Sequence, residues 1–143
     1  MQAKDMVSKK KIGILAAISA AIVVALLLFW FWGGGVKSTL EEQTLTVRGY
    51  THSYTLSFSD MDEVYLLSHF NDGSSKMFSS VETYRSVNGN FSTAGLGEYR
   101  LDRYKRVERY IRIDAKGKTY VFNCSDEEST EEMYKAIVSH LNK

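Results

Sequence analysis

The chain has few of the residues from which catalytic and metal sites are built. Its 143 residues include no proline, a single cysteine (Cys124) and three histidines. One cysteine excludes an internal disulfide framework and every metal site that needs several thiolates. The histidines, His52, His69 and His140, are far apart and show no H-x-x-x-H spacing. We therefore expect no metal and no other cofactor, and we draw no functional inference from the missing proline.

A strongly basic domain is missing as well. The chain has 18 Lys and Arg residues against 17 Asp and Glu residues, a formal net charge of +1. Residues 36–143 alone carry 14 basic and 16 acidic side chains, a net charge of −2. Because nucleic-acid-binding domains gather positive charge on the folded part, we expect no nucleic-acid partner.

One long hydrophobic run stands near the N-terminus. Residues 12–32 contain no charged side chain, and Ser19 is their only polar one. At about 1.5 Å per residue such a helix is about 31 Å long, which matches the hydrocarbon core of a bilayer. Trp30 and Trp32 at its end suit the membrane interface. We expect a transmembrane helix that anchors the chain in the lipid bilayer. The alternatives are a buried core helix and a cleaved signal peptide, whose apolar region is usually about 7–15 residues.

The charges that flank this run predict its orientation. Four basic residues precede the hydrophobic run, whereas only two, Lys37 and Arg48, follow shortly after it. Those preceding residues are Lys4, Lys9, Lys10 and Lys11. Because Lys and Arg collect on the cytoplasmic side, we expect residues 1–11 inside a bacterial cell. The C-terminal domain is then expected outside the plasma membrane of a single-pass protein.

The rest of the chain predicts a linker followed by a strand-rich domain. Residues 33–43 are expected to be a glycine-containing linker, in which Gly33-Gly34-Gly35 forms a short flexible hinge. In residues 44–143, short apolar segments alternate with turn residues, as in β-strands. The expected strands cover residues 44–48, 54–58, 64–67, 99–103, 107–113 and 119–122. Turns are expected at residues 49, 71–75 and 115–118, and a glycine-spaced loop at 86–97.

The C-terminus has the period of a helix. Met133, Ile137 and Leu141 recur every four residues and form one apolar stripe. Ser125 followed by Glu128, or Ser129 followed by Glu132, fits a capping box. The sequence therefore predicts a β-rich α+β domain in which one C-terminal helix closes an antiparallel β-structure.

Several segments of this domain carry a family resemblance. They are Asn88-Gly89, Gly95-Leu96-Gly97-Glu98-Tyr99-Arg100-Leu101, Tyr110-Ile111-Arg112-Ile113, Gly117-Lys118-Thr119-Tyr120-Val121-Phe122-Asn123, Thr130 and Tyr134. Over about residues 44–142 the chain resembles the bacterial pleckstrin-homology (PH) domain family, whose members are often tethered to membrane spans. The resemblance implies a partly open β-barrel of about six to seven antiparallel strands closed by the C-terminal helix, and a binding role without catalysis. A phosphoinositide site does not follow, because residues 48–52 hold one arginine and one histidine. Residues 105–109 also replace a proline-containing stretch of the family.

A basic stretch is the first candidate binding site. Residues 100–112 contain six basic and two acidic side chains, a local net charge of +4. One hypothesis is an anion-binding face for lipid headgroups or a cell-wall polymer. The alternative is a set of solvent-facing strand residues, because strand alternation divides these charges between two faces. The candidate contacts are Arg100, Arg103, Lys105, Arg106 and Arg112.

The sequence gives little support to catalysis. The glycine-spaced residues 89–97 lack the Gly-Lys-Ser/Thr ending of a phosphate-binding loop. Cys124 precedes a helix whose dipole could lower the thiol pKa, but no base accompanies it in sequence. We therefore expect a non-catalytic, membrane-anchored binding or scaffolding protein with a protein or peptide partner, held through an exposed sheet edge. A homo-oligomer and a cryptic enzyme that uses Cys124 remain as alternatives.

Overall fold

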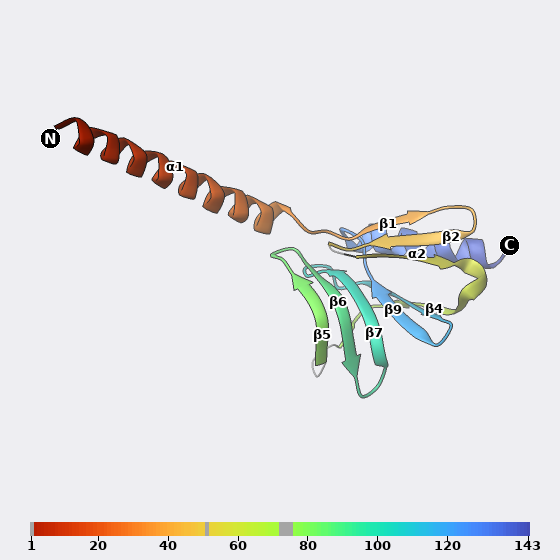
Figure 1. The fold of residues 1–143 in the computed structure, drawn as a ribbon. Helices are drawn as coiled ribbons and strands as arrows, with labels where there is room; N and C mark the ends of the chain where they lie inside the picture. The colour runs from red at the N-terminus through yellow and green to blue at the C-terminus, as the bar shows by residue number, and fades with distance from the viewer. Residues whose placement is uncertain (1, 51, 72–75) are drawn as a thin grey trace. The chain divides into compact units, whose positions relative to one another are not determined.

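The computed structural model describes residues 2–50, 52–71 and 76–143 of the chain. These residues form two compact units, one ending at Gly33 and the other comprising Gly34–Lys143. Figure 1 traces the first as a single helix and the second as two sheets with a C-terminal helix.

The first unit is the helix α1, Gln2–Trp32. Its segment Ser8–Trp32 is long and apolar enough to cross a membrane, and its side chains are exposed. The one polar side chain of the apolar run is satisfied within the helix, since the Ser19 hydroxyl donates to the carbonyl of Leu15 at 2.9 Å. The predicted helix over residues 12–32 is therefore present, and it begins further toward the N-terminus.

The first residues of the second unit, from Gly34 on, pack against other residues of that unit. Gly34 has a φ of 76°, and a Cβ built at this position would lie 2.6 Å from Cγ2 of Thr83. The Tyr104 hydroxyl donates to the carbonyl of Val36 at 3.2 Å, and Val36 is buried. The strand β1, Lys37–Leu40, follows at once. Residues 37–40 of the expected linker over residues 33–43 therefore form a strand that pairs with the next one, and Val36 before them is buried.

A three-stranded antiparallel sheet has the order β1-β2-β3, with β2 at Thr44–Arg48 and β3 at Ser53–Ser57. Leu45 and Val47 of β2 are fully buried, as the alternation predicted. The turn predicted at Gly49 is present, since its backbone N–H donates to the carbonyl of His52 at 2.9 Å.

A six-stranded sheet has the order β4-β8-β9-β7-β6-β5. Its strands are β4 (Met61–Leu67), β5 (Lys76–Glu82), β6 (Ser86–Thr93), β7 (Gly97–Tyr104), β8 (Tyr110–Ala115) and β9 (Lys118–Phe122). A 3₁₀ turn, η1 at Phe58–Asp60, leads from β3 into β4. All neighbours are antiparallel except β7 and β9, which run parallel.

Three sequence-based expectations need correction. The described residues contain nine strands, whereas six to seven were expected, and the β7–β9 pair is parallel. The described strands form two sheets and no closed barrel, which does not contradict the expected partly open one. The loop expected over residues 86–97 is largely β6, in which Ser86, Asn88 and Asn90 form a polar face and Gly89 interrupts the apolar face between Val87 and Phe91. The turn predicted at residues 71–75 lies mostly outside the described residues.

The main core joins the two sheets and the C-terminal helix. Its fully buried members are Leu45, Val47, Ile111, Ile113, Phe122 and Ile137. A second cluster lies on the other face of the six-stranded sheet, around Phe91, Tyr99 and Leu101. Burial of each large side chain stabilises the fold by about 1.5–3 kcal/mol, so the second unit has an ordinary single-domain core.

The predicted C-terminal helix is confirmed as α2, Glu127–Leu141. Ile137 of the predicted stripe is fully buried, while Leu141 at the helix end is 37% exposed. The N-cap is Asp126, whose carboxylate accepts from the backbone N–H of Ser129 at 2.7 Å. Neither predicted capping box is therefore the one used, because an aspartate between the two serines caps the helix.

Candidate functional site

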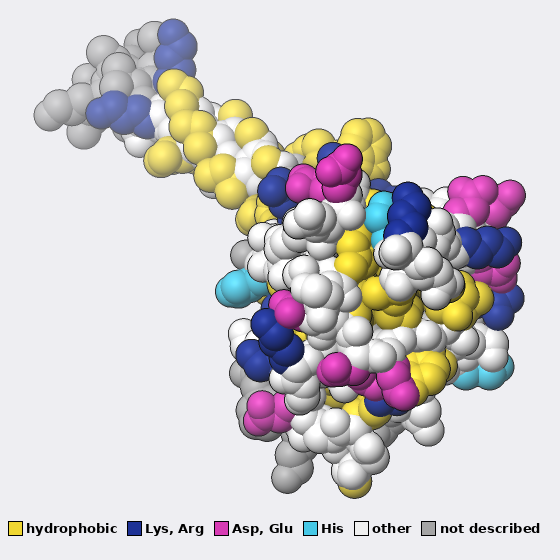
Figure 2. All heavy atoms as spheres, turned by 90° about the vertical axis from the view of Figure 1, so that its right-hand side faces the viewer, with side chains coloured by type: hydrophobic (Ala, Val, Ile, Leu, Met, Phe, Trp, Pro, Cys, Tyr) yellow, Lys and Arg dark blue, Asp and Glu magenta, His cyan; other side chains and the backbone are white. Residues whose placement is uncertain are grey.

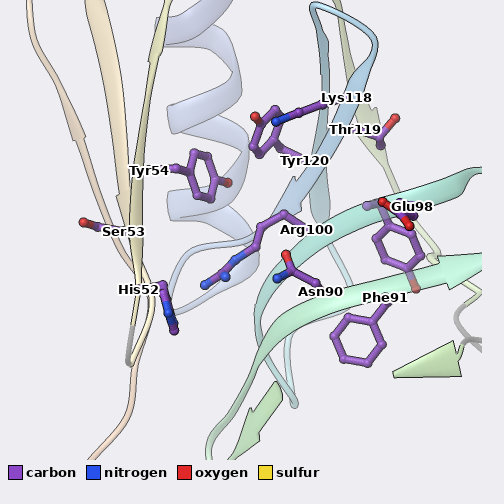
Figure 3. A pocket seen from close by; sticks show the side chains of 11 residues that line it. His52, Ser53, Tyr54, Asn90, Phe91, Glu98, Arg100, Lys118, Thr119 and Tyr120 are labelled. Carbon is purple, nitrogen blue, oxygen red and sulfur yellow. The ribbon is translucent and has the colours of Figure 1, made fainter. Parts of the chain in front are cut away.

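A cleft of about 570 Å³ lies where the edge strand β3 faces strands β6, β7 and β9. In Figure 3, Tyr54 projects from β3 toward Arg100 of β7 and Tyr120 of β9, while Asn90 of β6 lies on the other side of Arg100. The size is that of a small-molecule or peptide site.

Strand alternation explains the polar character of this cleft. Phe122 of β9 and Ile111 of β8 point into the main core, whereas β6 and β7 place polar side chains on the corresponding face of their half of the sheet. These polar residues are Ser86, Asn88, Asn90, Arg100 and Asp102. The polar half of the sheet therefore forms the floor of the cleft and of the network beneath it.

Two tyrosines form one wall of the cleft. The ring centroids of Tyr54 and Tyr120 are 4.7 Å apart. Tyr54 as a whole is half-buried, but its hydroxyl oxygen is buried and has no hydrogen-bond partner among the described residues. Burial, followed by the nearby Asp102 carboxylate, raises the pKa of Tyr54 well above its usual value, so this hydroxyl stays protonated.

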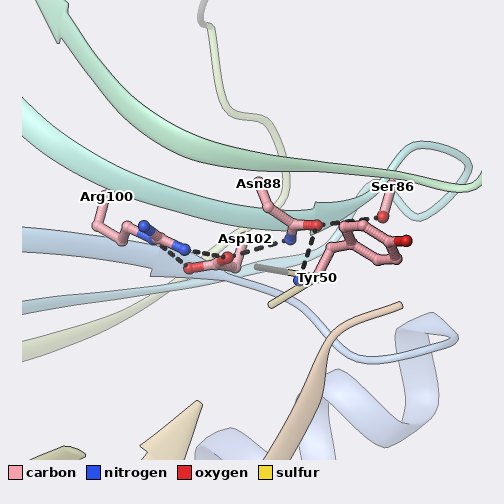
Figure 4. Close-up of polar contacts among 5 residues, drawn as sticks. All are labelled: Tyr50, Ser86, Asn88, Arg100 and Asp102. Carbon is pink, nitrogen blue, oxygen red and sulfur yellow. Dashed lines mark hydrogen bonds and ion pairs between the residues drawn. The ribbon is translucent and has the colours of Figure 1, made fainter. Parts of the chain in front are cut away.

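A buried hydrogen-bond network lies beneath the cleft (Figure 4). Arg100 donates to Asp102 through Nε at 2.9 Å and Nη2 at 3.1 Å, and Asn88 donates to the same carboxylate at 3.0 Å. Asn88 in turn accepts from the backbone N–H of Tyr50 at 3.3 Å and from the Ser86 hydroxyl at 3.3 Å. The network therefore ties the β2–β3 turn to β6 and β7 and fixes the position of Arg100.

The formal charges around the cleft cancel. Arg100 and Lys118 line it, and Glu98 lines it as well. Asp102, directly beneath, is fully buried and bound to Arg100. Two positive and two negative charges therefore leave no excess of either sign, and the exposed His52 lies at the edge of the site.

The basic stretch does not form one face. Arg100 turns into the cleft floor, whereas Arg112 pairs with Asp114 and lies over the Tyr65 ring. The remaining contacts are Arg103 to the Tyr110 hydroxyl, Lys105 to Glu82, Arg106 to Tyr84 and Arg109 to Glu131. In the face shown in Figure 2, Lys and Arg side chains alternate with Asp and Glu without a single basic patch. Most of these basic side chains thus form ion pairs or hydrogen bonds with other residues of the same unit.

The predicted membrane-interface residues lie on α1. Lys9, Lys10 and Lys11 precede the apolar surface, and Trp30 and Trp32 are exposed near its other end. Figure 2 shows the apolar covering of this helix and the lysines at its far end. This distribution is that of a helix with polar and aromatic ends around an apolar middle.

Cys124 is a poor nucleophile candidate. Its side chain is half-buried, with Sγ 3.5 Å from the Ser38 hydroxyl. Burial raises the pKa of the Cys124 thiol, which is the opposite of the helix-dipole effect considered from sequence. Among the residues that the structure describes, no three His, Cys, Asp or Glu side chains are grouped to hold a metal ion.

Among the candidate contacts predicted from the sequence, Arg100 lines the cleft, and the other cleft residues were not singled out. The sequence predicts Tyr54 and Tyr120 in strands and Asn90 in a loop, and it assigns none of them to a binding site. The overlooked signal is the spacing of Ser86, Asn88 and Asn90, which puts three polar side chains on one face of a strand. Comparison of the chain with protein-family models, with curated proteins and with solved structures finds no match.

Proposed function

We propose that this chain is a non-catalytic binding protein, anchored in a bacterial plasma membrane by α1, that holds an extended peptide segment of a partner protein in the cleft beside β3. The observation that carries this proposal is the cleft of about 570 Å³, lined by polar and aromatic side chains, at an open sheet edge. The resemblance to the bacterial PH domain family supports the same class of function, and membership of that family is part of the proposal.

The edge of β3 supplies a means of recognition. Among the described strands, β3 pairs only with β2, so its other edge is not used in a sheet. Main-chain N–H and C=O groups on a free edge can pair with an added strand, as in peptide recognition by β-augmentation. The neighbouring cleft would accept the side chains of that strand, which gives affinity and specificity together.

Binding of anionic lipid or wall polymer by residues 100–112 is the less favoured proposal. Arg100, Lys105 and Arg112 already pair with carboxylates. An anion would have to displace these carboxylates before it could use the positive charge. An enzyme is less favoured too, because the raised pKa of Cys124 keeps its thiol protonated near neutral pH.

The anchor and its orientation complete the proposal. The length and apolar surface of Ser8–Trp32 support a membrane span, and Lys9, Lys10 and Lys11 support a cytoplasmic N-terminus. The cleft-bearing unit would then lie on the outer side of the membrane.

Site-specific photocrosslinking in native membranes tests this function. A photoreactive residue replaces Ser53 beside the cleft, and a matched one replaces the exposed Ser139 on α2. We expect a discrete adduct from position 53 only, and its loss when Asn90→Trp fills the cleft. The same adduct from both positions, or none from position 53, would contradict the proposal.

A further inference from the structure

The cleft contains a hydrogen-bond donor that lacks an acceptor. The Tyr54 hydroxyl is buried, protonated and without a partner among the described residues. It points between Arg100 and Tyr120 (Figure 3). A buried donor without an acceptor lowers the stability of the free protein, so a group that enters between these two side chains and accepts a hydrogen bond would be held there.

The charges of the site indicate what that acceptor is. Arg100 is bound by Asp102 through two hydrogen bonds, and the cleft residues Lys118 and Glu98 have opposite charges. A carboxylate or phosphate entering beside Tyr54 would meet a guanidinium already paired with Asp102, in a cleft with no net positive charge, and would lose its hydration. An uncharged acceptor avoids this cost. The site therefore favours a neutral carbonyl over an anion.

The shape of the site adds that the acceptor belongs to a planar group. The Tyr54 and Tyr120 rings, with centroids 4.7 Å apart, present a flat apolar wall. Asn90, exposed in the same cleft, offers a side-chain carbonyl that could accept from an N–H group. An amide is planar and neutral, and it carries both a C=O acceptor and an N–H donor.

We propose that the cleft recognises an amide group of the bound peptide and that the Tyr54 hydroxyl donates to its carbonyl oxygen. The inference rests on the proposed function, because it specifies which chemical group of the peptide the cleft beside β3 binds. The amide belongs either to the main chain of the peptide or to an Asn or Gln side chain. Under this proposal, Tyr54 determines specificity, and the basic stretch has no direct part in binding.

The test uses the full chain in lipid nanodiscs and a display library of random dodecapeptides, with counter-selection on empty nanodiscs. Affinities of the enriched peptides are then measured for the wild type, Tyr54→Phe and the control Tyr65→Phe, which removes an exposed hydroxyl outside the cleft. We expect Tyr54→Phe to weaken binding about three- to tenfold, as loss of one neutral hydrogen bond would. Tyr65→Phe should leave the affinity unchanged.

Two peptide changes identify the source of the amide. Amide-to-ester replacement weakens main-chain carbonyl acceptors, and Asn or Gln→Leu removes side-chain ones; one of them should abolish the difference between the wild type and Tyr54→Phe. Raising salt from about 0.05 to 0.5 M should change the affinity little, because no ion pair forms with the peptide.

The two levels of the proposal fail in different ways. A library that yields no cleft-dependent peptide overturns the peptide-binding function and this inference with it. Peptides that bind Tyr54→Phe as well as the wild type, or acidic peptides whose binding collapses at high salt, overturn only the role of Tyr54 and the neutral amide.

Discussion

Arg100 and Asp102, two residues apart on β7, form a bidentate ion pair whose carboxylate is fully buried, with Nε–Oδ2 and Nη2–Oδ1 distances of 2.9 and 3.1 Å. Arg112 and Asp114 repeat this arrangement on β8, with distances of 3.1 and 2.8 Å. The Asp114 side chain, however, keeps 22% of its exposure. The two pairs therefore share a geometry and differ in burial, which makes one a control for the other.

Asp102→Ala should destabilise the second unit by about 3–5 kcal/mol, because it leaves the Arg100 guanidinium and the Asn88 amide without their buried acceptor. Asp114→Ala should cost no more than about 1 kcal/mol, as is usual for accessible pairs. Urea unfolding of the full chain in detergent micelles, followed by tyrosine fluorescence, measures both. Equal losses would show that burial does not distinguish the pairs.

Gly49→Ala should destabilise the fold by about 1–3 kcal/mol, because a Cβ at this position overlaps Oδ1 of Asp102. Gly95→Ala is the matched control, since its Cβ meets no atom within 4 Å and Gly95 does not have a positive φ. Thermal unfolding of the two variants compares them. A loss in Gly95→Ala as large as that in Gly49→Ala would argue against a tightly packed network under the β2–β3 turn.

Tyr54→Phe should stabilise the protein without ligand by about 1 kcal/mol, because it removes a buried hydroxyl that has no acceptor. The pH dependence has a defined sign. The folded-state pKa of Tyr54 is raised. The wild-type free energy of unfolding therefore keeps its full value, as far as this group is concerned, below about pH 10, the pKa in the unfolded chain, and it falls as the pH rises further. Tyr54→Phe should therefore lose less stability than the wild type between neutral and strongly alkaline pH. An identical alkaline profile would contradict the burial of this hydroxyl.

Asp126→Ala should lower the melting temperature, because α2 loses the carboxylate that accepts from Ser129. Hydrogen bonds from the backbone and side chain of Ser129 hold the pKa of Asp126 below its usual value. This contribution is present above the unfolded-state pKa and is lost as the pH falls through the lowered folded-state pKa. Asp126→Asn, which caps without titrating, should keep the cap and remove that acid-sensitive part. Melting curves at several acidic pH values compare the three proteins.

Cysteine labelling tests the proposed orientation. In a Cys124→Ala background, Ser125→Cys places a thiol on the exposed surface of the second unit, and Ser8→Cys places one before the apolar run. A membrane-impermeant maleimide applied to intact bacterial cells should label position 125 and spare position 8 until the membrane is permeabilised. The reverse pattern would place the cleft in the cytoplasm.

The elements with strong periodicity were predictable. The buried alternation of Leu45 and Val47 and the four-residue repeat through Ile137 follow from how strands and helices divide their faces between core and solvent. The length and apolar composition of α1 likewise predicted a continuous helix. For these elements, the apolar residues that set the periodicity of the sequence are the same residues that a strand or helix places on its apolar face.

The site was less predictable, because it depends on contacts between distant segments. Tyr54 meets Tyr120 across 66 positions of sequence, and Asn88 accepts from Tyr50 across 38. The parallel pairing of β7 with β9 could not be inferred from either strand alone, since period-two patterns carry no information about strand direction. The N-cap differed from prediction because Asp, like Ser, accepts the first orphan N–H groups, and several acceptors precede α2.

The docking of residues 34–36 leaves Gly33 alone between the end of α1 and the folded unit. Two peptide units join the Cα atoms of Trp32 and Gly34, so these two atoms are at most about 7 Å apart. For a chain whose α1 crosses the bilayer, Gly34, the first residue of the second unit, stays within about 7 Å of Trp32 at the end of the span. Partners would then be met by diffusion in two dimensions, at a high effective concentration, and a weak intrinsic affinity would be enough to keep them engaged.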